Sequence, residues 1–420
     1  MVRFARDGEQ ADSSWSTSRG LWERMRSAAA AEPRGADTAP AARIIGLDLA
    51  RLLAVLGMVA AHIFLGNAPE VALLAITGFP AALFAVLGGV SAVVSTRSQV
   101  HEGRVFAACA SVVLRGGILL LIGTLLGLLP NFIVMVLAYY GAALAITGLL
   151  LWLPTWLLAL GATTLVFISP YAILAVRQAT TSEPIAVPVL DSPLSFIQTI
   201  GFTGFYPAVT WLTYMLIGVC VGRWLLNAPL TANRTLRGAA VGALIAVAGS
   251  ASDLASRGLM IDQLRREGSS FDEAQHLLTA EGHGTPLSGG WVALLNAAPH
   301  TGSSADILRT AGVGILILTL LVAATASNKQ PLRQPLDALA RAGAASLTIY
   351  VLQYGSVPIM LIVTSLLLQD TEAAPAIQVL TLFAHAVLIA ALSWLLSRLN
   401  RRGPLEALVS DLVKAFTSRA

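Results

Sequence analysis

Two ionisable residues stand eleven positions apart in the otherwise apolar stretch "RLLAVLGMVAAH", which runs from Arg51 to His62. Eleven steps of about 100° along an α-helix return to within about 20° of the starting direction, so both side chains share one face, roughly 16 Å apart along the axis. Asp48 precedes Arg51 by one turn and can pair with it. The spacing predicts a helix that offers a cation near one end and a titratable imidazole nearer the other.

This pair suits a group transfer across a membrane. A guanidinium group binds the phosphate oxygens of an anionic donor, and a histidine acts as a base or a nucleophile near neutral pH. Each residue also has a plainer interpretation. Arg51 could extend its charge to the membrane interface, and His62 could be a buried, hydrogen-bonded histidine.

Further polar residues interrupt other apolar runs. Arg115, in "VVLRGGILLLIG", lies near the middle of a predicted span and indicates a cavity or an anionic ligand. Arg223, in "VGRWLL", is either a phosphate contact or a charged anchor at the end of a span. His385, in "LFAHAVLIA", is interpreted as a packing histidine that forms a hydrogen bond.

A second polar group, "PHTGSSAD", contains His300 and Asp306 just before another predicted span. An imidazole, a carboxylate and several hydroxyls could hold a sugar-like acceptor. The alternative is a helix cap, with Ser303 or Ser304 at the N-cap and Asp306 in the first turn. The two interpretations are compatible.

The composition shows which elements must position these residues. The chain of 420 residues is 56% hydrophobic and only 12% charged, against about 25% charged residues in soluble domains. The sequence predicts an all-α, polytopic integral membrane protein with about ten transmembrane helices of about 20 residues each. The expected spans are 43–65, 72–96, 105–128, 131–152, 155–176, 205–226, 235–254, 305–326, 343–368 and 374–397.

Basic residues cluster on alternate loops, which predicts that both termini are cytosolic. We expect a disordered polar tail over 1–42, without a cleavable signal peptide, a membrane domain over 43–398, and a basic cytosolic tail over 399–420. The outer loops lie near 178–204 and 256–304, the latter with one or two amphipathic helices. Cys109 and Cys220 fall in apolar runs, so no disulfide framework is expected, and no metal-binding motif is present.

Several stretches resemble a known family. They are, in chain order, "RIIGLDLARLLAVLGMVAAH", "FPAALFAVLGGVS", "VLRGGILLLIGTLLGLL", "YPAVTWLTYMLIGVCVGR", "PHTGSSADIL" and "AGAASLTIYVLQ". They are similar to bacterial membrane proteins with a heparan-alpha-glucosaminide N-acetyltransferase-type catalytic domain, over roughly 43–368. The arginine, ten residues and histidine of the first helix also resemble the motif of the acyltransferase-three proteins. Both groups belong to a wider transmembrane acyltransferase superfamily.

The resemblance implies transfer of an acyl group, usually acetyl, from cytosolic acyl-CoA to a hydroxyl or amine of a glycan or glycolipid on the far side. It implies a catalytic role for His62 and contacts to the CoA phosphates for Arg51, Arg115 and Arg223, with Asp48 beside Arg51. His300 matches a histidine expected in the bacterial relatives, so either histidine could do the chemistry.

The chain departs from the family pattern in three places. Thr77, Gly78 and Phe79 replace an Asp-Gly-Arg-like stretch, and Gln353 stands where some relatives have histidine. The active histidine that the lysosomal enzyme has in the loop after its first helix has no counterpart between Leu65 and Leu74.

The rival function is a transporter or flippase for a lipid-linked glycan or a small anion, against which stands the lack of an internal repeat. An inactive relative retained as a scaffold is a third possibility. We expect a bacterial cell-membrane location, no nucleic-acid partner and a possible homo-oligomer.

Overall fold

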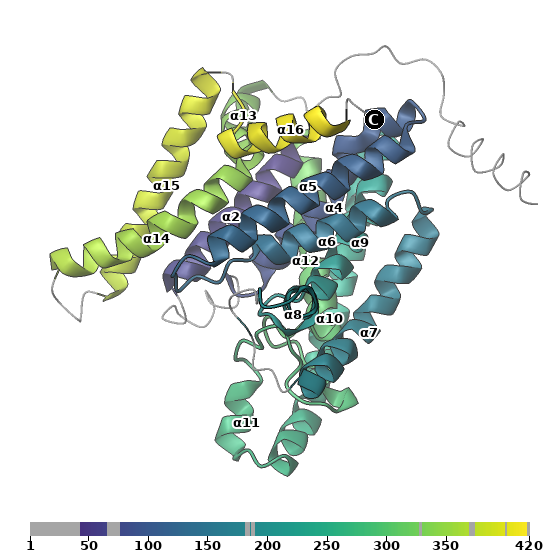
Figure 1. The fold of residues 1–420 in the computed structure, drawn as a ribbon, viewed down its shortest axis with the longest axis vertical. Helices are drawn as coiled ribbons and strands as arrows, with labels where there is room; N and C mark the ends of the chain where they lie inside the picture. The colour runs from purple at the N-terminus through teal and green to yellow at the C-terminus, as the bar shows by residue number, and fades with distance from the viewer. Residues whose placement is uncertain are drawn as a thin grey trace, which may run out of the picture. The chain divides into compact units, whose positions relative to one another are not determined.

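The computed structural model describes residues 43–64, 76–180, 185, 190–326, 330–368, 374–399 and 401–417, and Figure 1 shows their arrangement. The predicted tail over 1–42 lies outside the described residues. The helices are α2 (Ile45–Phe64), α4 (Phe79–His101), α5 (Val105–Gly127), α6 (Leu137–Leu150), α7 (Thr155–Thr180), α8 (Pro193–Gln198), α9 (Ala208–Leu226), α10 (Ala232–Arg266), α11 (Phe271–Leu277), α12 (Ser304–Ala326), α13 (Gln330–Ala344), α14 (Ser346–Leu368), α15 (Ala374–Arg398) and α16 (Pro404–Thr417), with a π-helix at Thr199–Thr203 and a 3₁₀ turn at Trp291–Leu294.

The all-α, polytopic architecture is confirmed. Each of the ten predicted spans contains a helix, and nine helices of the described residues are long and apolar enough to cross a membrane. The tenth, α6, has 14 residues, fewer than the roughly 20 that a full crossing needs.

One helix extends beyond its predicted span. The sequence predicts a span over 235–254 and amphipathic helix in the loop from 256, and the structure joins the two, since α10 is a single helix of 35 residues that ends at Arg266. The extension persists because Met260 and Leu264 are buried against Ala274 of α11 and Val292 of the 3₁₀ turn. These apolar contacts stabilise the helix beyond its hydrophobic span.

Glycines bring neighbouring helices together, as is common where helices pack in a membrane. An added Cβ at Gly116 of α5 would lie 2.3 Å from the backbone nitrogen of Ala145 in α6. Gly242 of α10 and Gly312 of α12 approach each other's helix backbone in the same way, as do Gly89 of α4 and the backbone of Met215 in α9. These pairs fix the spacing of α5 with α6, α10 with α12, and α4 with α9.

The contacts also show which helix ends lie together. Gly46, in the first turn of α2, packs on Val322 near the end of α12, so these two helices run antiparallel. Gly218 and Gly222 of α9 meet Val86 and Val90 of α4, so α4 and α9 run parallel. We call the end where α2 begins the arginine end. The end where α2 finishes and where α4, α9 and α12 begin is the histidine end.

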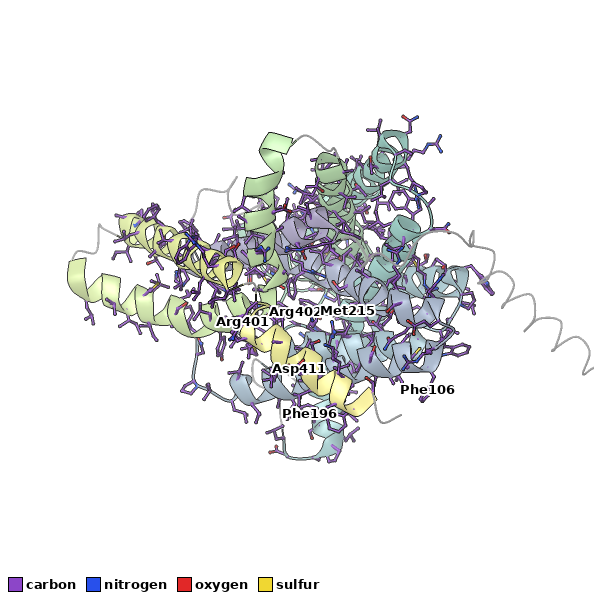
Figure 2. All side chains as sticks on the ribbon, turned by 90° about the horizontal axis from the view of Figure 1, so that it is seen from above. Phe106, Phe196, Met215, Arg401, Arg402 and Asp411 are labelled. Atoms are coloured by element: carbon purple, nitrogen blue, oxygen red, sulfur yellow. The ribbon has the colours of Figure 1, made fainter. Side chains whose placement is uncertain are left out.

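The predicted basic tail over 399–420 contains an ordered helix. α16 packs on α5 and α14 (Figure 1). Val409 and Val413 are buried, whereas Leu408, Leu412 and Phe416 are exposed. Arg401 and Arg402 lie where the chain enters α16, and Asp411 lies farther along it (Figure 2). The tail therefore belongs to the folded part of the molecule at the arginine end.

Candidate active site

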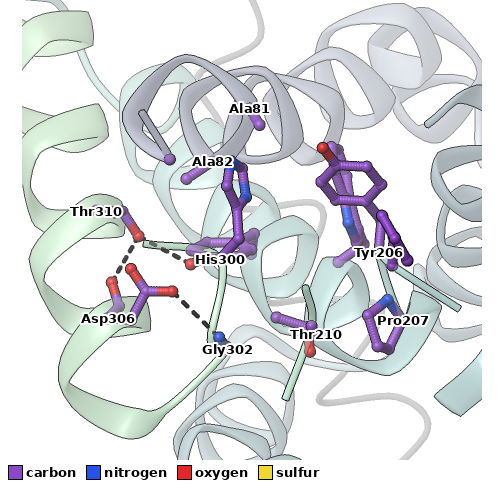
Figure 3. Close-up of a pocket in the computed structure, with 14 residues that line it drawn as sticks. Ala81, Ala82, Tyr206, Pro207, Thr210, His300, Gly302, Asp306 and Thr310 are labelled. Carbon is purple, nitrogen blue, oxygen red and sulfur yellow. Dashed lines mark hydrogen bonds between the residues drawn. The ribbon is translucent and has the colours of Figure 1, made fainter. Parts of the chain in front are cut away.

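A cavity opens at the histidine end, where α4, α9 and α12 begin. It has an empty volume of about 410 Å³, counted to its open mouth (Figure 3). The predicted residues His300 and Asp306 both line it. The other lining residues are Gly78, Ala81, Ala82, Phe205, Tyr206, Pro207, Thr210, Trp211, Tyr214, Gly284, Gly302 and Thr310.

Asp306 serves two purposes in the first turn of α12. The hydroxyl of Ser303 accepts a hydrogen bond of 3.0 Å from the Asp306 backbone N–H, so the predicted helix cap is confirmed. The Asp306 Oδ2 atom accepts a bond of 3.1 Å from the Gly302 N–H. Its Oδ1 atom is buried, forms an ion pair of 3.7 Å with Arg309 Nη2 and has no hydrogen-bond partner among the described residues. One carboxylate oxygen thus has an ion pair but no hydrogen bond within this part of the chain.

His300 occupies a strained position on the cavity wall. Its φ of +56° is in the left-handed region that non-glycine residues rarely adopt. Its ring packs edge-on against Tyr206, with 5.4 Å between ring centroids. Burial lowers the pKa of the His300 imidazole, although the Glu281 carboxylate acts in the opposite direction; His283 lowers it further. The depressed pKa keeps the ring neutral, the form that can accept a proton.

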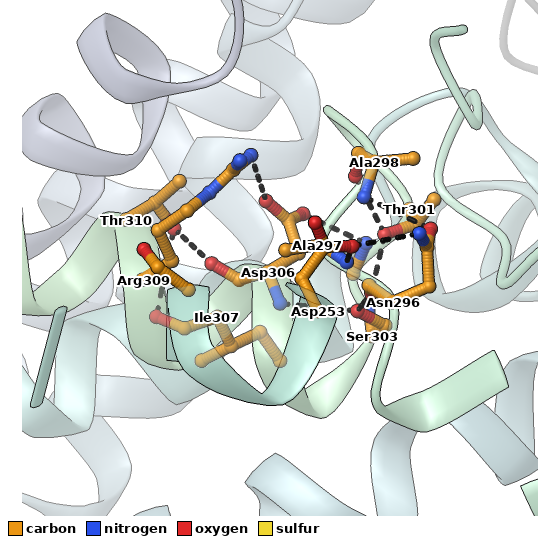
Figure 4. Close-up of polar contacts among 12 residues, drawn as sticks. Asp253, Asn296, Ala297, Ala298, Thr301, Ser303, Asp306, Ile307, Arg309 and Thr310 are labelled. Carbon is orange, nitrogen blue, oxygen red and sulfur yellow. Dashed lines mark hydrogen bonds and ion pairs between the residues drawn. The ribbon is translucent and has the colours of Figure 1, made fainter. Parts of the chain in front are cut away.

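A buried polar network holds the loop that carries His300 (Figure 4). Asp253 of α10 accepts hydrogen bonds of 2.8 Å from the Asn296 side chain and from the Ala297 N–H. The Ser303 hydroxyl donates a bond of 2.5 Å to the Asn296 carbonyl. The loop is therefore tied to α10 on one side and to the start of α12 on the other. Such support can maintain an unfavourable backbone conformation at a functional residue.

His62 lies in the last turn of α2, at the same end of the bundle. The Gln378 side chain of α15 donates hydrogen bonds to the carbonyls of Ile63 (3.1 Å) and Phe64 (3.4 Å), which anchors this turn. The His62 Nδ1 atom is buried and has no hydrogen-bond partner among the described residues. His62 lies close enough to His300 for an electrostatic interaction between the imidazoles, although it does not line the cavity. The two histidines that the sequence offers as alternatives therefore lie at the same end of the bundle.

The arginine end holds the predicted cations. Arg51 donates hydrogen bonds to Asp48 (2.5 Å) and to Ser91 of α4 (2.6 Å). Arg115 of α5 has electrostatic interactions with Arg51 and with Tyr140 of α6. Arg51 and Arg115 therefore gather at one place from separate helices.

Arg223, in the last turn of α9, lies at the same end but has structural partners. Its guanidinium donates to the carbonyls of Leu151 (2.5 Å) and Leu153 (2.8 Å), and to the Thr155 hydroxyl (3.2 Å), at the turn between α6 and α7. These bonds satisfy backbone groups at a helix end. His385 is likewise satisfied, with contacts of 2.9 Å to the Ser356 hydroxyl and the Thr381 carbonyl, which confirms its packing role.

A row of aromatic rings leads from the arginines to the histidines. Tyr140, which interacts with Arg115, packs edge-on against Trp211 at 6.0 Å between centroids. Trp211 meets Tyr206 at 6.3 Å, and Tyr206 meets His300. Burial raises the pKa of the Tyr206 phenol, so its hydroxyl stays protonated and can donate a hydrogen bond. Edge-on ring contacts thus run without interruption from Tyr140 to His300.

Sequence reasoning missed the part of the site that α9 supplies. Tyr206, Trp211 and Tyr214 come from "YPAVTWLTY". Thr210 presents a buried hydroxyl that has no hydrogen-bond partner within the part of the chain that the structure describes. The aromatic spacing in that stretch was the available signal. Among the described residues, no three histidine, cysteine, aspartate or glutamate side chains converge as metal ligands would.

Comparison with known protein families gives a match that spans most of the chain. The family described as an acyltransferase domain, acyltransferase-three, matches residues 44–398. A search of curated proteins found no match. The matched region contains both histidines of the candidate site as well as Arg51 and Arg115, and it favours an enzyme over a transporter. The chain belongs to the acyltransferase-three family of membrane acyltransferases.

Proposed function

We propose that the protein transfers an acyl group, acetyl in the simplest case, from acyl-CoA to a hydroxyl or amine of a glycan or glycolipid. The observation that carries this proposal is the layout of α2. This helix contributes Arg51 to the arginine end and His62 to the histidine end, eleven residues apart. The donor is bound at the first end, and its thioester reaches the second. With both termini cytosolic in a bacterial cell membrane, the donor enters from the cytosol.

The donor site uses Arg51 and Arg115, whose guanidinium groups form charge-assisted hydrogen bonds with phosphate oxygens. Asp48 holds the Arg51 side chain in place through its 2.5 Å contact. Arg223 is left out because its donors already bind the backbone of the α6–α7 turn. The acyl-pantetheine arm runs along the rings of Tyr140 and Trp211.

The acceptor site is the cavity at the histidine end. Aromatic rings pack against the apolar faces of sugars. The Oδ1 atom of Asp306, which is ion-paired with Arg309 but has no hydrogen bond among the described residues, accepts a hydrogen bond from an acceptor hydroxyl. The resemblance to heparan-alpha-glucosaminide N-acetyltransferase-type proteins supports a glycan acceptor.

The chemistry needs one base. A neutral imidazole, His62 or its neighbour His300, takes the proton of the acceptor O–H or N–H as that atom attacks the thioester carbonyl. The tetrahedral intermediate collapses, the carbon–sulfur bond breaks, and the CoA thiolate takes the proton from the imidazolium. In a two-step variant the imidazole itself attacks the thioester, the carbon–sulfur bond breaks, and CoA leaves as the thiol with the proton of the imidazole. The acceptor oxygen or nitrogen then attacks the acyl-imidazole, and the released imidazole takes the proton of the acceptor.

Calorimetric binding of acetyl-CoA tests the proposal without knowledge of the acceptor. We expect the wild type to bind and Arg51→Ala to bind at least tenfold more weakly, since one charge-assisted hydrogen bond contributes about 1.5–3 kcal/mol. His62→Ala should bind normally but lose transfer. Arg104→Ala is the matched control, because Arg104 is an exposed arginine at the same end. A folded wild type that binds no acyl-CoA would refute the donor assignment and revive the transport alternative.

A further inference from the structure

The chain continues beyond the family domain, which ends at 398. The additional segment enters α16, whose first turn lies beside the first turn of α14. Burial of Val409 and Val413 fastens the helix to the bundle. A segment outside the common domain therefore forms part of the arginine end in this protein.

The entry to α16 is fixed in position by Glu406. This carboxylate accepts hydrogen bonds from the backbone N–H groups of Leu347 (2.6 Å) and Thr348 (3.1 Å) and from the Thr348 hydroxyl (2.6 Å). It thereby caps the exposed N–H groups that begin α14. Gly403 is buried beneath this contact, and an added Cβ there would lie 2.0 Å from Glu406 Oε2. The backbone of the neighbouring residue, Arg402, is therefore held beside the first turn of α14.

Arg402 lies close enough to Arg115 for an electrostatic interaction, and Arg115 interacts in turn with Arg51. The hydroxyl of Tyr140 in α6 lies against Gly88 of α4. Gly88 is one turn from Ser91, which binds Arg51, so Tyr140 and Arg51 approach the same part of α4.

The packing of the helices agrees with this placement. Gly343, just before α14, lies against the backbone of Asp48 in α2, Glu406 of α16 binds the first turn of α14, and α16 packs on α5. Arginines of α2, α5 and the segment that enters α16 thus lie at one end of the bundle.

The charge of this cluster is poorly balanced. Over the described ranges, Asp48 is the one acidic side chain that forms an ion pair with any of the three arginines. Converging like charges are unfavourable unless an anion binds among them. Arg402 is exposed, whereas Arg51 and Arg115 are half-buried, so the three are arranged from the surface inward.

We propose that Arg402 is a third arginine of the donor site and that the α16 segment brings it to the phosphate groups of acyl-CoA. The inference rests on the proposed function, because it assigns a new residue to the same donor site. CoA carries a diphosphate and a ribose phosphate, which need several cations. Arg402 meets these groups at the surface, and Arg115 and Arg51 bind them farther in.

The test is calorimetric binding of acetyl-CoA to the full chain, in wild type, Arg402→Ala, Arg402→Lys and Arg401→Ala. We expect Arg402→Ala to weaken binding about tenfold and to flatten its dependence on salt. Arg402→Lys keeps the charge and should stay within about threefold of wild type. Arg401→Ala removes an adjacent exposed arginine and should stay within about twofold.

Equal losses in Arg401→Ala and Arg402→Ala would overturn the proposal, because they would indicate general charge attraction. Wild-type affinity in Arg402→Ala, beside weak binding in Arg51→Ala, would remove Arg402 from the site and leave the proposed function intact. A wild type without affinity would instead refute the proposed function itself. Since Arg402 is exposed, the thermal unfolding temperature of its variants should match that of the wild type, which separates lost binding from lost folding.

Discussion

At the scale of single residues, the histidine end concentrates unusual conformations and unpaired atoms. Among the described residues, His283 and His300 are the two non-glycine residues with a φ in the left-handed region, and both belong to the wall of the cavity or its rim. Thr210 and Asp306 each present a buried oxygen without a hydrogen-bond partner. Strain and unsatisfied polar atoms cost free energy, and they are common where a ligand supplies the missing contacts.

Removal of the His300 imidazole should change how stability depends on pH. Burial lowers the folded-state pKa of His300 below its ordinary value of 6.5. Between these two values the unfolded chain binds more protons than the folded one, so the wild type loses stability as the pH falls below about 6.5. The His300→Gln variant should lose less stability than the wild type over this range, as measured by the fall in thermal unfolding temperature between pH 8 and pH 5.

His276→Gln is the control for this measurement, because His276 is exposed on α11. Its thermal unfolding temperature should fall between pH 8 and pH 5 by as much as that of the wild type. If the unfolding temperature of His300→Gln fell by as much as that of the wild type, the buried imidazole would not set the pH dependence of stability.

At the scale of elements, glycines decide how closely the helices approach. The α5–α6 contact depends on Gly116 and Gly123 of α5, which meet Ala145 and Ala138 of α6. This contact places Arg115, the residue before Gly116, beside Tyr140. Helix packing and the geometry of the donor site are therefore linked.

Gly116→Ala should destabilise the protein by about 1–3 kcal/mol, because its Cβ would lie 2.3 Å from the Ala145 nitrogen and force the helices apart. Gly117→Ala is the matched control, since nothing lies within 4 Å of a Cβ at that position. It should be neutral or stabilising by up to about 1 kcal/mol through helix propensity. The measurement is thermal unfolding of purified protein in detergent. Equal effects of the two substitutions would contradict the close α5–α6 packing.

At the scale of the whole molecule, the two ends of the bundle have different chemistry. The arginine end offers Arg51, Arg115 and Arg402, whereas the histidine end offers a cavity with imidazoles, aromatic rings and a carboxylate. A reaction divided between two sides of a membrane requires this separation. It also requires that the arginine end faces the cytosol.

Cysteine labelling tests that orientation. In a background in which Cys109 and Cys220 are replaced by alanine, Asp272→Cys places a thiol on α11 and Asp411→Cys places one on α16, both at exposed positions. We expect an impermeant maleimide to label position 272 in intact cells and position 411 only after the cells are opened. The reverse pattern would place the arginine end outside, away from cytosolic acyl-CoA.

The sequence by itself determined the spans, because apolar runs of about 20 residues are a strong local signal. It also singled out Arg51 and His62, because charge inside such runs is expensive and rarely accidental. Only the tertiary structure decided which residues meet. The loop held by Asp253 brings His300 near His62, and the segment that enters α16 brings Arg402 near Arg115. In each pair the two residues are more than 200 positions apart in the chain. Spacing within one helix specifies a helix face, but contacts between distant segments depend on packing that no local pattern records.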